Sequence, residues 1–109
     1  MNQGLRRYRK ASCRICVPVG LPEALQSQVR ELVSVISEAP RKGHATALMH
    51  KVCDEADDAW LTLMLLVKPF DQGMTEEQLM HFYERFDFFV AGHDPTIMVR
   101  APHKPRRLH

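Results

Sequence analysis

The sequence predicts an all-α fold, a single three-helix domain over residues 1–109 with a basic arm at each end. Apolar residues recur at helical spacing in three segments, at about 22–38, 44–67 and 75–91, and a proline or glycine follows each one. Hydrophobic residues make up 45% of the chain and charged residues 26%, which is typical of a globular protein. A chain of 109 residues also suits one domain with one core.

The first segment, at about 22–38, carries signals of a helix at both ends. Pro22 suits a first turn, where no backbone donor is needed, and the acid Glu23 complements the helix dipole there. Pro40 stands just after the end, where it cannot continue a helix. The apolar positions between them follow helical spacing, at Leu25, Val29, Leu32, Val33 and Ile36.

The second segment, at about 44–67, is the longest predicted helix. Its apolar stripe consists of Ala45, Leu48, Val52, Ala56, Ala59, Leu63 and Leu66. Pro69 disfavours helical geometry at Lys68 and ends the segment. Trp60, Met64 and Val67 add a second apolar stripe, so the last part of this helix is apolar on every side. Such a helix is normally buried all round.

The third segment, at about 75–91, has the clearest start signal. Thr75 and Gln78 have the spacing of a capping box, and Met74 and Leu79 have the spacing of a hydrophobic staple. Gly92 suits a left-handed C-cap. The buried face of this helix is expected to contain Leu79, Phe82, Tyr83, Phe86 and Phe89.

The first and third predicted helices are too few to cover every side of the second one. The two shorter helices cover two of its sides, so a second copy of the chain is expected to cover the third as a two-fold dimer. The dimer or partner interface is predicted at Trp60, Met64, Val67, Phe88 and Phe89, because aromatic residues and methionine often anchor interfaces. The alternative cover is the N-terminal arm, which carries Ile15, Val17 and Val19.

The arms, residues 1–20 and 95–109, concentrate the positive charge. Nine of the fifteen Lys and Arg residues lie outside residues 15–99, whereas all thirteen acids lie inside that range. This distribution favours, as an alternative function, a nucleic-acid-binding accessory protein. Its contacts would be Arg6, Arg7, Arg9, Lys10, Arg106 and Arg107. The acidic run at residues 54–58 argues against it, because acids repel phosphate.

Three cysteines do not indicate a disulfide scaffold, so a reducing cytoplasm is expected. The sharpest metal-like pattern pairs Cys13-x-x-Cys16 with His50-x-x-Cys53, since zinc is bound by four thiolate or imidazole ligands. The sequence favours a zinc-binding module less than it favours a protein-binding regulator or a nucleic-acid-binding protein. Val-Pro-Val follows Cys16 where zinc ribbons have a glycine turn, and Cys53 falls on an apolar stripe where a buried thiol is ordinary.

No catalytic or cofactor motif stands out in the sequence. HExxH, GxSxG, the P-loop and GxGxxG are all missing, so we expect a protein without catalytic residues, cofactor or metal. A membrane span needs about 20 apolar residues in a row. The longest apolar stretch is bounded by Asp58 and Lys68, so no membrane span is expected.

The apolar stripes from Leu25 to Ile36 and from Leu48 to Val67 resemble those of the small all-helical anti-activators of bacterial quorum sensing, of the TraM and QslA types. The resemblance covers the middle half of the chain and is architectural, without a shared motif. It implies a homodimer that binds a transcription factor and blocks its dimerisation or its binding to DNA. We therefore expect a small, non-enzymatic bacterial regulator that acts by protein–protein contact.

Overall fold

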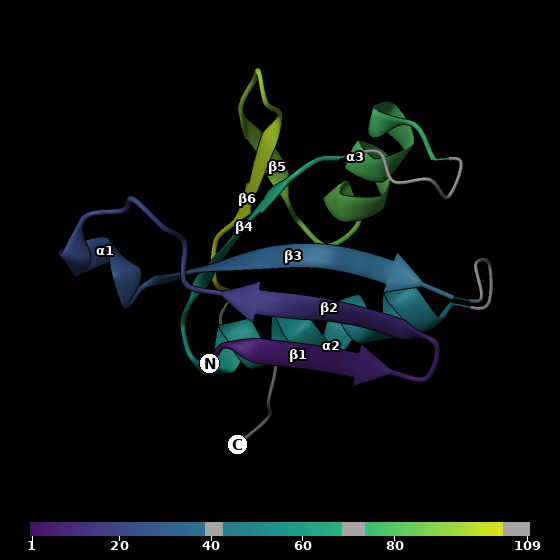
Figure 1. The fold of residues 1–109 in the computed structure, drawn as a ribbon, viewed down its shortest axis with the longest axis horizontal. Helices are drawn as coiled ribbons and strands as arrows, with labels where there is room; N and C mark the ends of the chain where they lie inside the picture. The colour runs from purple at the N-terminus through teal and green to yellow at the C-terminus, as the bar shows by residue number, and fades with distance from the viewer. Residues whose placement is uncertain (39–42, 69–73, 104–109) are drawn as a thin grey trace.

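The computed structural model describes residues 1–38, 43–68 and 74–103, and it shows an α/β fold (Figure 1). The described residues form one six-stranded sheet, in the strand order β1-β2-β3-β4-β6-β5, with three helices. The elements are β1 (Gly4–Tyr8), β2 (Ala11–Cys16), α1 (Glu23–Gln26), β3 (Val29–Ser37), α2 (His44–Asp58), β4 (Thr62–Leu66), α3 (Glu76–Glu84), β5 (Phe89–Gly92) and β6 (Ile97–Arg100).

The sheet is mixed, with one parallel pair at its centre. Strands β3 and β4 run parallel, and every other neighbouring pair is antiparallel. Parallel neighbours need a long crossover connection, and here helix α2 lies within that crossover. The chain therefore contains a β3–α2–β4 unit flanked by a hairpin on each side.

The core lies between one face of the sheet and the helices α2 and α3. Alternate residues of the strands point to this face, because successive side chains of a strand point to opposite faces. Helix α2 lies behind β1, β2 and β3 in Figure 1. The tightest core positions are Cys13 and Ile15 on β2, Leu63 and Leu65 on β4, Met98 on β6, and Leu48, Met49, Val52 and Ala56 on α2.

The opposite side of the sheet, which we call the open face, is only partly buried. Its apolar side chains come from β1, β3, β4, β5 and β6, and they include Leu5, Val33, Ile36, Met64, Leu66, Phe89, Ile97 and Val99. These side chains are half-buried or exposed, unlike their neighbours on the core face. The sheet thus has one apolar face under helices and one that faces the viewer in Figure 1.

The all-α prediction is wrong, and the predicted helix at about 22–38 shows why. Only Glu23–Gln26 is helical, and Val29–Ser37 forms β3. The apolar residues of Val29–Ser37 are β-branched except for Leu32, and such residues favour strands. Pairing with β2 and β4 decides the outcome, since tertiary contacts override a helical spacing.

The predicted helix at about 44–67 is also two elements. Helix α2 begins at His44, as predicted, but it ends at Asp58. Trp60 follows with a φ of 56°, in the left-handed region, and turns the chain into β4. The apolar run at residues 61–67 therefore contains a central strand, β4, which lies between β3 and β6 in the sheet. A buried central strand is apolar on both faces, so it does not form the predicted helix that is apolar on every side.

The remaining boundaries are corrected in the same way. The predicted helix at about 75–91 divides into α3 (Glu76–Glu84) and β5 (Phe89–Gly92), with Asp87 in the left-handed region between them. The predicted N-terminal arm, residues 1–20, contains the β1–β2 hairpin and is not an extended tail. The predicted C-terminal arm, residues 95–109, begins with β6, and its residues 104–109 lie outside the described residues. The capping box at Thr75 and Gln78 is confirmed, with both reciprocal hydrogen bonds present.

Candidate functional site

The two parallel strands separate after only three paired positions. Val29–Glu31 of β3 pairs with Thr62–Met64 of β4, and no later described residue of β3 pairs with β4. The end of β4 pairs with β6 on its other side. Figure 1 shows β3 and β4 diverging towards their carboxyl ends. We call these diverging segments, residues 32–37 and 65–66, the splayed pair. Ligands of open α/β sheets bind at the carboxyl ends of such strands.

A β-bulge lies in β3 within the splayed pair. Val33 pairs with Arg14 and Ile36 pairs with Ser12, so two residues of β3 lie opposite Cys13 of β2 alone. Ser34, the first of these two, has a φ of 55°, which a non-glycine residue adopts only at a cost of about 1–3 kcal/mol. Bulges turn backbone groups out of the ladder and occur often beside active sites.

Helix α2 begins at the same end of the parallel pair. Its N-cap, Gly43, has a φ of 77°, and no side chain caps the first turn. The first turn also carries no acid, whereas the first turn of α3 carries Glu76 and Glu77. The first N–H groups of α2 therefore keep their capacity to bind an anion, and the positive end of the helix dipole favours one. Arg41 and Lys42, next to Gly43 in the sequence, lie outside the described residues.

The side chain of His44, in this first turn, contributes one more unpaired group. Its Nδ1 atom is enclosed and has no hydrogen-bond partner among the described residues. The imidazole ring contacts the edge of Tyr8 at 6.5 Å between centroids. The β1–β2 hairpin and the start of α2 are therefore neighbours.

Tyr83 of α3 lies in the core, on the helix side of the sheet. Its side chain is 6% exposed and packs against Phe82 and Phe88. Burial, with a smaller contribution from the nearby Cys13, raises the pKa of the Tyr83 hydroxyl to about 12. Cys13, buried on the core face of β2, is the residue opposite the bulge of β3. The hydroxyl stays protonated at neutral pH and can donate a hydrogen bond.

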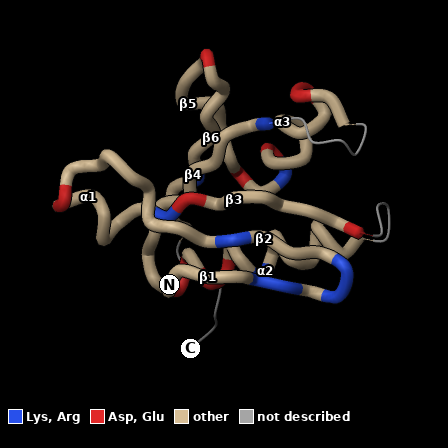
Figure 2. The backbone as a smooth tube through the Cα atoms, in the orientation of Figure 1, with Lys and Arg blue, Asp and Glu red and all other residues tan. Residues whose placement is uncertain are grey.

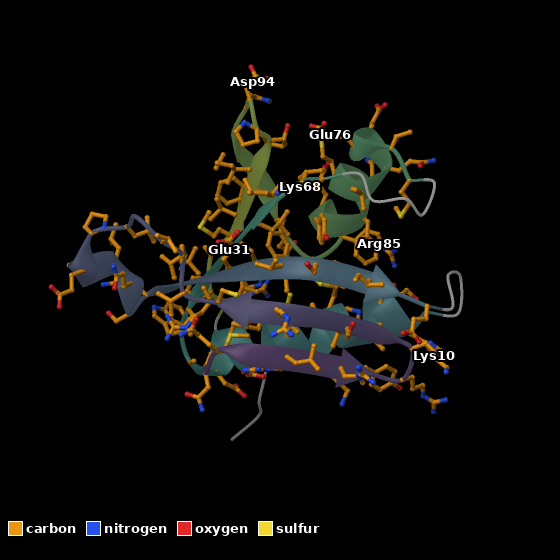
Figure 3. The ribbon with its side chains drawn as sticks, in the orientation of Figure 1. Lys10, Glu31, Lys68, Glu76, Arg85 and Asp94 are labelled. Carbon is orange, nitrogen blue, oxygen red and sulfur yellow. The ribbon has the colours of Figure 1, made fainter. Side chains whose placement is uncertain are left out.

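Glu31 is the acidic residue at the point of divergence. It belongs to the last paired position of the parallel ladder, opposite Met64. Because its neighbour Leu32 is buried on the core face, the Glu31 side chain points to the open face, where it is half-buried. Figure 3 labels Glu31 where β3 and β4 come together. An acid, a protonated hydroxyl, a bulge and an uncapped helix thus surround the splayed pair.

The residues predicted for a dimer or partner interface are dispersed. Val67 and Phe88 lie in the core, 5% and 3% exposed, so they are not available to a partner in this structure. Trp60 and Phe89 are 61% and 55% exposed, but Trp60 lies in the turn before β4 and Phe89 on the open face. Met64 is half-buried on the open face. The homodimer itself stays a prediction.

The structure does not assemble the zinc ligands considered from the sequence. Cys13 and Cys16 are three positions apart on a strand, so their side chains point to opposite faces of the sheet. His50 packs against the ring of Phe86. Within the described residues, no three metal-binding side chains come together. Burial raises the pKa of Cys13 and of Cys53 to about 11, which opposes thiolate formation at either residue.

The predicted nucleic-acid contacts lie mainly in the β1–β2 hairpin. Arg6 forms an ion pair with Glu55 of α2, at 2.8 Å between Nη2 and Oε2. Arg7, Arg9 and Lys10 are exposed. Figure 2 shows the basic residues of the hairpin turn in blue. Arg106 and Arg107 lie outside the described residues.

No sequence pattern predicts that Glu31, Ser34, Gly43 and Tyr83 belong to one candidate site. A usable signal was the order strand, glycine and helix around Gly43, which is typical of phosphate-binding turns. That signal was hidden because the strand before it was interpreted as a helix. The left-handed φ of Ser34 has no sequence signature, since it depends on pairing with β2.

Comparison with known proteins gives structural neighbours but no sequence relatives. No protein-family model matches the chain, and no curated protein matches it. The crystal structure of the anti-CRISPR protein AcrVA5 is similar with a TM-score of 0.73 and 19% identity, over 93% of this chain and 100% of that one. The crystal structure of a putative acetyltransferase from Exiguobacterium sp. 255-15 is similar with a TM-score of 0.57 and 19% identity, over 84% of this chain.

This chain matches only 53% of the length of the Exiguobacterium structure. Both neighbours overturn the resemblance to helical quorum-sensing anti-activators, and with it the expected regulatory function, because the shared fold is a mixed sheet. They also give no support to the nucleic-acid alternative. In the part of the chain that the structure describes, no helix is long and apolar enough to cross a membrane. The Exiguobacterium structure is named a putative acetyltransferase, and the likeness to it is one of fold.

Proposed function

We propose that this chain is an acyltransferase that moves an acetyl group from acetyl-coenzyme A to an amine. The observation that carries the proposal is the splayed parallel pair, found in a fold similar to that of an acetyltransferase. The sequence-based expectation of a protein without catalytic activity is set aside on these grounds. Glu31, Tyr83 and the start of α2 supply groups that this reaction needs.

The donor fits the splayed pair in shape and in polarity. The pantetheine part of coenzyme A is an extended chain with two amides, so it can hydrogen-bond to strand edges that lack a neighbour. Residues 32–36 of β3 and 65–66 of β4 offer such edges towards each other. The diphosphate of the donor then falls towards the N-terminus of α2, where unpaired N–H groups and the helix dipole favour an anion.

The reaction replaces one bond to the acetyl carbon with another. The amine nitrogen attacks the thioester carbonyl, a C–N bond forms, the C–S bond breaks, and the electron pair leaves with the sulfur. Glu31, at the open face, accepts the proton that the amine loses. Tyr83, on the core side, donates a hydrogen bond to the departing thiolate, since a tyrosine hydroxyl is protonated at neutral pH and burial raises its pKa further, to about 12.

Glu31 also favours an amine acceptor over a neutral one. A carboxylate attracts the ammonium form of an amine to the open face before the proton is removed. In the described part of the chain, both larger helices lie on the other side of the sheet, so the acceptor approaches the open face without a helix in its path.

A second candidate function follows from the similarity to AcrVA5, which extends over that whole protein. The match spans 100% of the anti-CRISPR protein AcrVA5 and 93% of this chain, so the two chains share nearly their whole folds. Inhibition of a CRISPR system is therefore a second proposal, and it is compatible with acetyl transfer. Survival of a phage targeted by CRISPR, with and without the chain, tests it, and equal survival in both cases contradicts it.

Acetyl transfer is tested by the release of free thiol from acetyl-coenzyme A in the presence of amine acceptors, including lysine peptides and polyamines. Glu31→Gln is expected to lower kcat by about 100- to 10,000-fold, because a general base contributes this much. The matched control is Glu23→Gln, which removes the same charge from an exposed position in the short helix α1. The proposal fails if the unaltered protein neither binds the donor nor releases thiol.

A further inference from the structure

A cluster of basic side chains surrounds Tyr8 beside the start of α2. The Nζ of Lys51 lies 5.2 Å and the Cζ of Arg9 lies 5.8 Å from the centre of the Tyr8 ring. Lys10 follows Arg9 in the two-residue turn of the hairpin and is exposed. We call Arg9, Lys10 and Lys51 the Tyr8 cluster. Figure 2 shows the blue turn of the hairpin, and Figure 3 labels Lys10 at its tip.

The cluster lies at the same end of the sheet as the splayed pair. The N–H of Glu38, just past β3, donates a 2.7 Å hydrogen bond to the carbonyl of Lys10. The ring of Tyr8 also meets His44 in the first turn of α2. The hairpin turn, the carboxyl end of β3 and the N-terminus of α2 are therefore adjacent.

Arg9, Lys10 and Lys51 do not take part in the ion pairs that the structure records among its described residues. The recorded pairs include Arg6 with Glu55, Arg100 with Asp57 and His103 with Asp87, and none of them contains a residue of the cluster. Glu38, whose backbone N–H bonds the carbonyl of Lys10, is an acid beside the turn, and its side chain is exposed. Three cations gathered at one end of the molecule thus attract an anion more strongly than the isolated bases elsewhere.

We propose that the Tyr8 cluster binds the 3′-phosphate of coenzyme A and so makes the protein select the 3′-phosphorylated donor. This inference rests on the proposed acetyl-coenzyme A function and specifies which form of the donor the site takes. A donor whose diphosphate meets the first turn of α2 continues into its adenosine phosphate at the surface. The side chains of the hairpin turn and of Lys51 are long and flexible, so their positive charges can reach that 3′-phosphate.

The test compares the affinity of the full chain for coenzyme A and for 3′-dephospho-coenzyme A by isothermal titration calorimetry. The two ligands differ only in the 3′-phosphate, so the ratio of their Kd values reports the cluster. We expect the unaltered protein to bind coenzyme A about tenfold more tightly at low salt, with a smaller ratio at high salt because exposed charges are screened. A triple variant, Arg9→Gln with Lys10→Gln and Lys51→Gln, is expected to bring the ratio close to one.

The matched control is Arg7→Gln, which removes the same charge from the same hairpin. Residue 7 lies next to Tyr8 in β1, so its side chain points to the opposite face of the sheet, and it is exposed. This control should keep the tenfold ratio. Equal affinities for the two ligands in the unaltered protein overturn the selectivity, as does a triple variant that weakens both equally. If neither ligand binds the unaltered protein, the proposed function itself fails.

Discussion

Replacing Arg100 with methionine should destabilise the protein far more than the same change at Arg6. Arg100 is 4% exposed at the end of β6, and its guanidinium donates two hydrogen bonds to Asp57 of α2, at 2.8 and 3.0 Å. Its Nε donates a third, at 2.8 Å, to the carbonyl of Phe86. The side chain therefore joins three elements: β6, α2 and the segment after α3.

The size of the effect follows from what Arg100→Met leaves behind. Asp57 keeps one hydrogen bond, from the N–H of His103 at 2.9 Å, but its buried charge loses its partner. Removing one member of a buried ion pair costs about 3–5 kcal/mol. At about 4 °C per kcal/mol for a domain of this size, the melting temperature should fall by roughly 12–20 °C.

Arg6→Met is the matched comparison, since Arg6 also binds a carboxylate of α2 with two nitrogens. Its partner Glu55 is 39% exposed, and water screens this pair, so the loss should be about 0–1 kcal/mol. Urea denaturation followed by circular dichroism measures both free energies of unfolding. A third variant, Arg100→Met with Asp57→Leu, should recover part of the loss because no unpaired charge remains. Equal losses in Arg100→Met and Arg6→Met would refute the reasoning.

The ion pair also has a functional consequence. Helix α2 packs against β1, β2 and β3, whereas Arg100 belongs to the β4-β6-β5 half of the sheet. With only three paired positions between β3 and β4, the Asp57–Arg100 contact is a second link between the two halves. Loss of that link should weaken donor binding in the splayed pair as well as lower stability.

Three further predictions address the site and the buried groups. Gly43→Ala should cost about 1–2 kcal/mol in urea denaturation, because an alanine is strained at a φ of 77° even though its Cβ meets no atom within 4 Å. Tyr83→Phe should lower kcat by about ten- to a hundredfold with little change in donor Kd, as measured by thiol release and calorimetry, since it removes one hydrogen bond to a developing thiolate. The contribution of Cys13 and Cys53 to folding stability should be constant below pH 9 and should fall as the pH rises towards about 11, because burial raises the pKa of each thiol from 9.0 to about 11. A flat stability profile across that range, measured by urea denaturation, would contradict the assigned burial of these thiols.

Local signals in the sequence located the starts of α2 and α3 but not the strands that follow them. The capping box at Thr75 and Gln78 is decided by neighbouring residues alone, so it could be read directly. The run at residues 61–67 could not, because a short apolar segment fits a buried strand as well as a buried helix. The left-handed φ of Trp60, which ends the helical stretch, is uncommon for a bulky residue and carries no sequence signal.

The candidate site was hidden for a related reason. Glu31 and Ser34 belong to a strand whose apolar residues also happen to match helical spacing, so neither was assigned to a sheet. Tyr83 was predicted to be buried, and it is, but its role depends on the distant Cys13 and the bulge opposite it. Phe88 and Val67 were expected at an interface, and only the sheet shows that they point into the core.

Nuclear magnetic resonance with labelled backbone amides tests the central claim most directly, through titration with acetyl-coenzyme A. Binding in the splayed pair predicts that the largest shifts occur at residues 32–37 of β3, at residues 65–66 of β4 and at the first turn of α2. Shifts confined to other surfaces, or no shifts at millimolar donor, would contradict the proposed site and the function built on it.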